Sequence, residues 1–192
     1  MFDVFEKYLS ARAPLTEKEF DLIRSLSREK RIAKRESIVR EGEIYRNAIF
    51  VTRGLLRLFR TDNEGNEYIL RFAFENRWLS ERESYLTGKP SQSSIEAIEY
   101  SEILVWQKEE LDLLLQEIPA LKEFMKTLVA KSQIANQNRV YASISHSAEE
   151  KYLQFLEKYP GLFNRVPLHM VASYLGVTRE TLSRIRRQFA GR

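Results

Sequence analysis

The middle of the chain consists of short β-like runs that are rich in apolar residues. Turns rich in charged residues, Gly and Asn separate these runs, for example residues 41–47 and 62–65. Short strands at this spacing predict a compact antiparallel sandwich or jelly roll. Gly42, Gly54 and Gly65 stand between the runs, where a positive φ is useful. The predicted strands are residues 37–42, 48–54, 55–61, 67–74, 94–99 and 102–107.

Helical spacing of the apolar residues replaces this pattern on both sides of the predicted strands. Before them, Phe20, Ile23 and Leu26 predict a helix over residues 15–29. After them, residues 107–119 predict a short helix that a proline closes.

A longer helix of about 26 residues is predicted next, over residues 120–145. A helix of this length is typical of a dimer seam. The polar stretch 131–139 makes the seam imperfect, so a helix that packs only on its own sandwich is the alternative. The apolar stripe of this helix contains Leu121, Phe124, Met125, Leu128, Ile134, Ala135, Tyr141 and Ile144.

The last quarter of the chain has the pattern of a helix-turn-helix. Ser147 and Glu150 have the spacing of a capping box, which predicts a new helix and a hinge before it. Within residues 166–178, a small apolar patch precedes Gly176, which tolerates the left-handed dihedrals that end a helix. A second helix follows this turn from Arg179. In a helix-turn-helix the second helix can enter the major groove of DNA.

The helix from Arg179 is predicted to be amphipathic. At 100° per residue, its polar side chains fall inside an arc of roughly 160°, opposite Leu182, Ile185 and Phe189. Thr178 is the expected N-cap. A solvated surface helix is the alternative interpretation. The polar side chains belong to Arg179, Glu180, Ser183, Arg184, Arg186 and Arg187.

These residue types suit the reading of base pairs. Arginine gives a bidentate pair to guanine, and glutamate accepts from the amino group of cytosine. The hydroxyls near the helix start, with Arg186 and Arg187 further along, can contact phosphates. A glutamate would weaken a purely electrostatic grip on DNA, so Glu180 among arginines favours base recognition.

The distribution of charge agrees with this motif. Residues 147–192 hold eight Lys and Arg against four Glu, a net charge of +4, which is also the net charge of the whole chain. The first 146 residues are therefore neutral overall. A neutral domain joined to a small basic one is expected of a nucleic-acid-binding protein.

Composition excludes several other classes of protein. The 192 residues are 43% hydrophobic, enough for a core, and they contain no Cys, which excludes disulfides and thiolate metal sites. No apolar run is long enough for a membrane span, and no signal peptide is visible, so a cytoplasmic protein is expected. The two histidines, His146 and His169, lie outside the predicted sandwich, which argues against metal-dependent or Ser-His-Asp catalysis. An enzyme is not expected.

The stretch "LGVTRETLSRI", residues 175–185, resembles the recognition helix of the CRP/FNR-type bacterial regulators. The resemblance covers nearly the whole chain and implies an α+β fold of the cyclic-nucleotide-binding type. That fold has a jelly-roll sensory domain over residues 1–118, a dimerisation helix and hinge over 119–146, and a helix-turn-helix domain over 147–192. It further implies double-stranded DNA, a second copy of the chain and RNA polymerase as partners.

The resemblance also assigns DNA contacts. In the family, the positions that match Arg179, Glu180 and Arg184 contact bases. One branch has arginine at the first of these positions, and the other has serine at the position of Ser183. Because this chain has both, its half-site could follow either branch. The expected DNA-binding residues are Thr178, Arg179, Glu180, Ser183, Arg184 and Arg187.

The expected effector pocket departs from the family pattern. Glu81 matches the ribose-binding glutamate, but either Ser91 or Gln92 occupies the position of the arginine that binds the cyclic phosphate. A buried phosphodiester needs a cation or many N–H donors. Cyclic AMP is therefore not the expected effector, and no cofactor is certain; another small effector remains open. The candidate pocket residues are Glu81, Arg82, Ser91, Gln92, Asn136 and Gln137.

The end of the chain departs from the family pattern as well. Family members carry a two-stranded wing after the recognition helix, and because only a few residues follow it here we expect little or no wing. The alternative function for the whole chain is a sensory or adaptor module that binds a small ligand or a protein and does not bind DNA.

Overall fold

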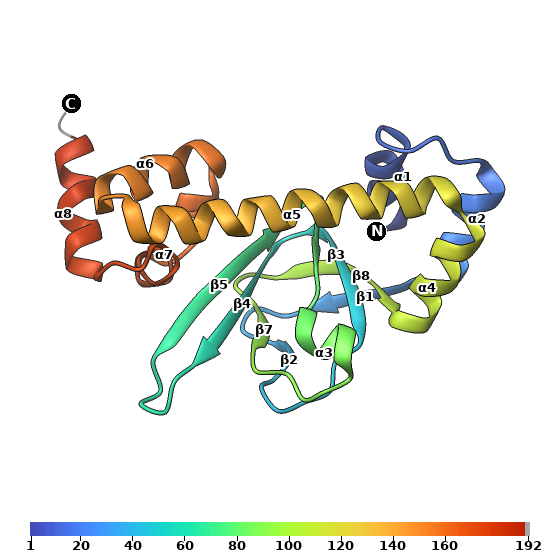
Figure 1. Cartoon of the computed structure of the whole chain (residues 1–192), viewed down its shortest axis with the longest axis horizontal. Helices are drawn as coiled ribbons and strands as arrows, with labels where there is room; N and C mark the ends of the chain where they lie inside the picture. The colour runs from blue at the N-terminus through green and yellow to red at the C-terminus, as the bar shows by residue number, and fades with distance from the viewer. Residues whose placement is uncertain (191–192) are drawn as a thin grey trace. The chain divides into compact units, whose positions relative to one another are not determined.

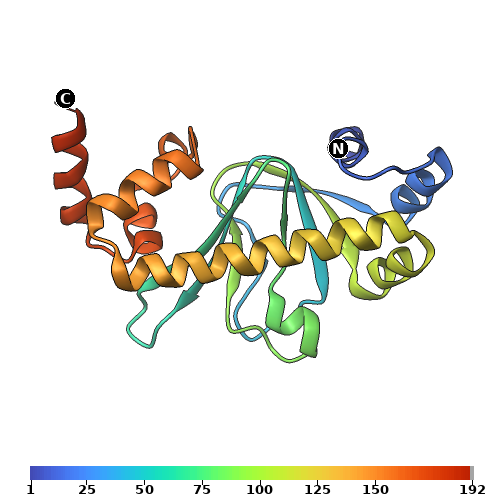
Figure 2. The same cartoon turned by 45° about the horizontal axis from the view of Figure 1, so that its top comes forward.

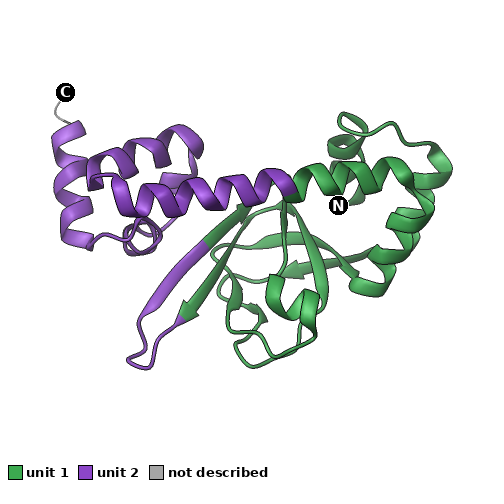
Figure 3. Ribbon diagram, viewed as in Figure 1, with its two compact units in different colours: residues 1–60, 71–129 green, residues 61–70, 130–192 purple. Residues whose placement is uncertain are grey.

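The structure is a computed structural model that describes residues 1–190 (Figure 1). It contains two compact units, residues 1–60 with 71–129 and residues 61–70 with 130–192 (Figure 3). The strands are β1 (Arg28–Ile32), β2 (Ser37–Val39), β3 (Asn47–Arg53), β4 (Leu55–Thr61), β5 (Glu67–Phe74), β6 (Arg77–Leu79), β7 (Ser94–Ala97) and β8 (Ser101–Gln107). The helices are α1 (Phe2–Ser10), α2 (Glu17–Ser25), α3 (Arg82–Thr87), α4 (Lys108–Glu117), α5 (Pro119–Ser145), α6 (Ala148–Lys158), the 3₁₀ helix η1 (Leu162–Asn164), α7 (Leu168–Leu175) and α8 (Arg179–Ala190).

The strands form two four-stranded sheets, in the orders β1-β8-β3-β6 and β2-β7-β4-β5. Buried aliphatic side chains from both sheets share one core cluster, which includes Ile49 and Ile103 from the first sheet and Leu56 and Ile95 from the second. Every predicted strand is present, so the predicted jelly roll is confirmed. β1 and β6 were not predicted.

Glycines close two of the tight connections between strands. Gly54 joins β3 to β4 with φ 97°, and Gly65 lies in the β4–β5 turn with φ 86°. Both angles lie in the region that favours glycine. Gly54 is also crowded, because a Cβ there would lie 2.6 Å from the Cα of Ser101. This close approach leaves room for no larger residue.

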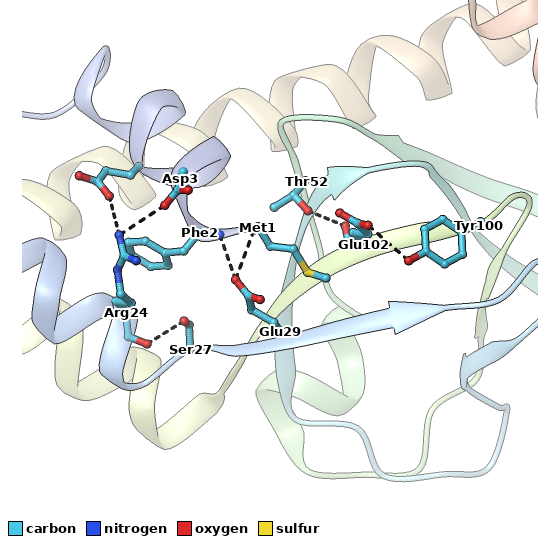
Figure 4. Close-up of polar contacts among 10 residues, drawn as sticks. Met1, Phe2, Asp3, Arg24, Ser27, Glu29, Thr52, Tyr100 and Glu102 are labelled. Atoms are coloured by element: carbon cyan, nitrogen blue, oxygen red, sulfur yellow. Dashed lines mark hydrogen bonds and ion pairs between the residues drawn. The ribbon is translucent and has the colours of Figure 1, made fainter.

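The N-terminal helices pack on the first sheet through aromatic side chains. Phe5 of α1 lies 4.9 Å from Phe50 and 5.1 Å from Trp106, measured between ring centroids. Glu29 of β1 accepts a hydrogen bond of 3.1 Å from the backbone amide of Phe2 (Figure 4). α2 ends at Ser25, earlier than the predicted residue 29, because β1 begins at Arg28 and pairs with β8.

α5 is a single continuous helix, as predicted (Figure 2). It begins at Pro119, a residue suited to the first turn because its missing N–H has no partner in a helix start. Leu121 is buried and Phe124 and Met125 are half-buried against the core, whereas Val140 (58%) and Ile144 (81%) are exposed. The helix therefore has apolar residues on an outward face as well as an inward one.

The second unit contains the second half of α5, followed by α6, η1, α7 and α8. The Ser147 capping box is confirmed: Oγ accepts from the amide of Glu150 at 3.2 Å, and the Glu150 carboxylate accepts from the amide of Ser147 at 2.8 Å. Within residues 1–190, no helix is long and apolar enough to cross a membrane. The expectation about the wing concerns residues beyond Ala190, which lie outside the described residues.

Candidate nucleic-acid interface

A three-residue turn joins α7 to α8. Gly176 adopts φ 67° and ψ 39°, and the backbone amide of Val177 donates to the carbonyl of Ala172 at 3.0 Å. The left-handed glycine thus ends α7 and satisfies one of its last carbonyls. Thr178 then accepts a hydrogen bond of 3.1 Å at its Oγ1 from the amide of Thr181. The predicted glycine turn and N-cap are both present.

Buried side chains fix the orientation of α8. Leu182 is fully buried and Ile185 is 2% exposed, and both lie one turn apart on the side that faces α6 and α7. Val171 and Ala172 of α7 are also buried. The small side chain of Ala172 suits a close helix–helix contact. Because one side of α8 is anchored in this core, the opposite side is presented in a defined orientation.

The opposite side of α8 carries the predicted DNA-binding residues. Among them, Ser183 is half-buried and the others are exposed. In the described part of the chain, none of the three arginines at positions 179, 184 and 187 forms an ion pair, so their guanidinium groups have no carboxylate to compete with a nucleic acid. Arg186 of the same helix makes a cation–π contact, because its guanidinium carbon lies 5.2 Å from the centroid of the Phe163 ring. The residues are Thr178, Arg179, Glu180, Ser183, Arg184 and Arg187.

The predicted effector residues in the first unit are held by local hydrogen bonds. Glu81 is 4% exposed, and its carboxylate accepts from the amide of Ser84 at 2.7 Å, which caps α3. Ser91 is 2% exposed, and its hydroxyl donates to the carbonyl of Ser93 at 2.6 Å. These bonds occupy both side chains within their own segments. Arg82 and Gln92 are exposed. Asn136 and Gln137 lie on α5 in the other unit and are also exposed.

A cation contacts the Ser91–Ser93 segment, but it comes from a strand that contributes none of the predicted pocket residues. Nε of Arg60 donates to the Ser93 hydroxyl at 3.2 Å, and the same guanidinium lies 3.8 Å from Glu83. Arg82, the one cation among the predicted pocket residues, does not make this contact in the described part of the chain. The only signal in the sequence is an arginine at the polar end of β4, about thirty residues before the segment it contacts.

The region around this segment matches a family model. Residues 29–117 match the model of the cyclic nucleotide-binding domain. The jelly roll, the long α5 and the helix-turn-helix occur here in the order that the CRP/FNR resemblance implies.

Curated relatives extend the similarity over most of the chain. The fumarate and nitrate reduction regulatory protein of Vibrio cholerae is 25% identical, over 91% of this chain and 74% of that protein. The cyclic AMP receptor protein of Thermus thermophilus is 23% identical, over 89% of this chain and 81% of that protein. The resemblance to CRP/FNR-type regulators is thereby confirmed, and these relatives come from both of its branches.

Solved structures support the fold independently. The c-di-GMP responsive regulator CLP of Xanthomonas campestris has a TM-score of 0.73 at 13% identity, with 92% of each chain covered. FixK2 of Bradyrhizobium japonicum has a TM-score of 0.73 at 18% identity, over 86% of this chain and 85% of that one. At these identities the similarity establishes the fold, which agrees with the predicted class.

Proposed function

We propose that this chain is a homodimeric, sequence-specific DNA-binding regulator of transcription. The observation that carries the proposal is the exposed face of α8. This face bears arginine and glutamate side chains, while Leu182 and Ile185 pack the opposite face into the core. A helix anchored on one side, with unpaired guanidinium groups on the other, suits the major groove. The regulatory names of the relatives agree with this function.

The side chains on this face have separate roles in the proposal. Arg179 and Arg184 pair with guanines, and Glu180 accepts from the amino group of cytosine. Thr178, Ser183 and Arg187 bind phosphates and set the register of the helix on the duplex. Sequence preference then depends on the first group, and the salt dependence of binding depends mainly on cations such as Arg187.

The dimer would form through the outward face of α5. Ile134, Tyr141 and Ile144 are 57–81% exposed, and at 100° per residue they fall within roughly 80° of one another around the helix axis. Ala135 and Ala142 point to the other side and line a cavity within the second unit. An apolar face of this kind on a long helix favours pairing with a second copy. RNA polymerase is the further partner that the resemblance implies.

The jelly roll would act as a sensory domain whose effector is not cyclic AMP, or which needs no effector. Neither Ser91 nor Gln92 provides a cation for a cyclic phosphate. Arg60 approaches the same segment, but it contacts Glu83 and Ser93. Calorimetric titration with cyclic AMP tests this part, and micromolar or tighter binding would contradict it.

Selection of bound duplexes from a random DNA pool, with the purified chain and no added ligand, tests the whole proposal. Enrichment of an inverted repeat, with half-sites about one helical turn apart, is the expected result. Enrichment of single half-sites would retain the DNA reader and reject the dimer. No enrichment, with or without cyclic nucleotides and cell extract, would favour the adaptor function instead.

A further inference from the structure

A cavity of about 400 Å³ lies within the second unit, and no part of the proposed function uses it. Its walls come from the first residues of β5, the second half of α5, α6 and α7, all of which belong to residues 61–70 and 130–192 (Figure 3). The volume lies within the range of small-molecule sites, which is about 300–1,000 Å³. Four segments that are distant in sequence converge on it.

The charged residues that line this cavity are all cations. Arg139, Lys151 and Lys158 contribute to the walls, and none of the lining residues is Asp or Glu. Arg139 donates to the backbone carbonyl of Leu70, and Lys151 donates to the carbonyl of Ser143 at 3.0 Å. Within residues 1–190, none of these three side chains forms an ion pair. The cavity therefore has positive charge that no protein carboxylate compensates.

An aromatic wall faces the same space. Phe155, Tyr159 and Tyr174 line the cavity, and the hydroxyl oxygens of the two tyrosines are 3.2 Å apart. Burial raises the pKa of Tyr174 to about 12, so its phenol is neutral at pH 7 and can donate a hydrogen bond. The guanidinium carbon of Arg139 lies 5.2 Å from the centroid of the Tyr174 ring. Cationic donors and aromatic surface are thus adjacent.

We propose that this cavity binds a small organic carboxylate that carries an aromatic ring system. The planar guanidinium of Arg139 suits bidentate pairing with a carboxylate, and the two lysines add charge that a second acidic group could use. The ring of the ligand would lie against Phe155 and Tyr174, where aromatic pairs prefer offset or edge-on contact. A bare inorganic anion would use the cations but leave the aromatic wall and most of the volume unfilled.

The position of the site connects it to the DNA-binding helices. Tyr174 belongs to α7, and the neighbouring Ser173 donates to the carbonyl of Glu67 at 2.9 Å and accepts from the amide of Ile69 at 3.0 Å. A ligand in the cavity would contact both α7 and the start of β5. This site is separate from the Glu81 and Ser91 segments of the jelly roll, which belong to the first unit.

Calorimetric titration of the full chain with 1-naphthoate, 1-naphthamide and inorganic phosphate tests the proposal without DNA. The amide has the same ring system without the charge, and phosphate has the charge without the ring. We expect naphthoate to bind at least about tenfold more tightly than either probe. Equal affinity for naphthoate and naphthamide, equal affinity for naphthoate and phosphate, or no naphthoate binding at millimolar concentration would each overturn the proposal.

Two variants place the binding in this cavity. Arg139→Gln and Lys158→Gln should each weaken naphthoate binding by about tenfold or less, with the larger loss for Arg139. Lys131→Gln is the matched control, because Lys131 is an exposed α5 residue that does not line the cavity. Circular dichroism checks that each variant is folded, and Lys158, which is exposed, provides the result if Arg139→Gln unfolds. Naphthoate binding that neither folded variant changes would refute this location. None of these experiments requires that the chain bind DNA.

Discussion

The guanidinium of Arg57 lies 3.0 Å from the carboxylate of Glu96, across the paired strands β4 and β7. Nε of Arg57 also donates to Glu96 at 3.1 Å, so two nitrogens of the same guanidinium contact this carboxylate. The Arg57 side chain is only 5% exposed and the Glu96 side chain 18%. The same guanidinium lies 4.0 Å from the centroid of the Phe59 ring. A charge this deeply buried depends on its partner.

Removal of one member of this pair should destabilise the protein strongly. Glu96→Ala removes the carboxylate that lies 3.0 Å from the buried guanidinium, and the expected loss is about 3 kcal/mol in the free energy of unfolding. Urea denaturation measures it. The double variant Arg57→Met/Glu96→Leu should recover much of the loss, because it removes both charges of this pair together. Glu83→Gln is the control, since its 3.8 Å ion pair is largely exposed and should contribute less than about 1 kcal/mol. Equal losses for Glu83→Gln and Glu96→Ala would contradict the prediction.

Gly54 should not tolerate a side chain. A Cβ there would lie 2.6 Å from the carbonyl oxygen of Tyr100, and φ is 97°. Gly54→Ala combines a steric clash with a strained dihedral, for a total of about 3 kcal/mol. Gly65→Ala is the matched control, because its φ is also positive, at 86°, but no atom lies within 4 Å of the added Cβ. Strain alone should cost that variant about 1–2 kcal/mol. Thermal unfolding of both variants gives the difference, and equal melting temperatures would show that the clash relaxes.

The Arg28–Glu110 ion pair should make the stability of the folded protein depend on pH in the acid range. Hydrogen bonds from Arg28 lower the pKa of Glu110. A lowered carboxyl pKa stabilises the folded state above the unfolded pKa, which is about 4.3 for glutamate, and this contribution is lost as pH falls through the folded value. The stability gap between the wild type and Glu110→Gln should therefore be full at pH 7 and shrink below about pH 4. Melting curves across this range measure the gap. A gap that stays constant into acid would exclude the linkage.

The sequence predicts those elements whose signal is local. The strands are visible because short apolar-rich runs lie between turn residues, and the turn at Gly176 is visible because glycine ends the helix before it. α1 is an exception, because it is not predicted although Phe2, Phe5 and Leu9, which are all buried, have helical spacing. β1 is not predicted either, because four of its five residues are exposed and it forms by backbone pairing with β8.

The candidate DNA-binding face was predictable for the same reason. Its residues lie on one helix, so a period of 3.6 residues is enough to place them on one face. The contact of Arg60 with Ser93 and the cationic cavity around Arg139 were not predictable. Each joins segments that only the tertiary fold brings together.

Two arginines of α8 should differ in what they contribute to DNA binding. Arg184→Ala should cost about 1–3 kcal/mol on the selected site and relax base preference at one position. Arg187→Ala should weaken binding to all sequences alike and reduce the salt slope by about one unit. Both side chains are exposed, so neither variant should unfold the protein. Titrations of matched and scrambled duplexes at several salt concentrations separate the two effects. Identical behaviour of the two variants on every duplex would refute the separate roles.

A charge on the outward face of α5 should disrupt the proposed dimer. Ile144 is 81% exposed in the single chain, so Ile144→Glu should leave the fold intact while placing an uncompensated carboxylate in the interface. We expect the dimer dissociation constant to rise by about tenfold or more. Lys18→Glu is the control, because it makes a larger change of charge at an exposed residue of α2, which is not part of the proposed interface. Sedimentation velocity over a range of concentrations measures both variants. If Ile144→Glu dimerises as the wild type does, the interface lies on another surface; if the wild type is a monomer at every concentration, the dimer itself is excluded.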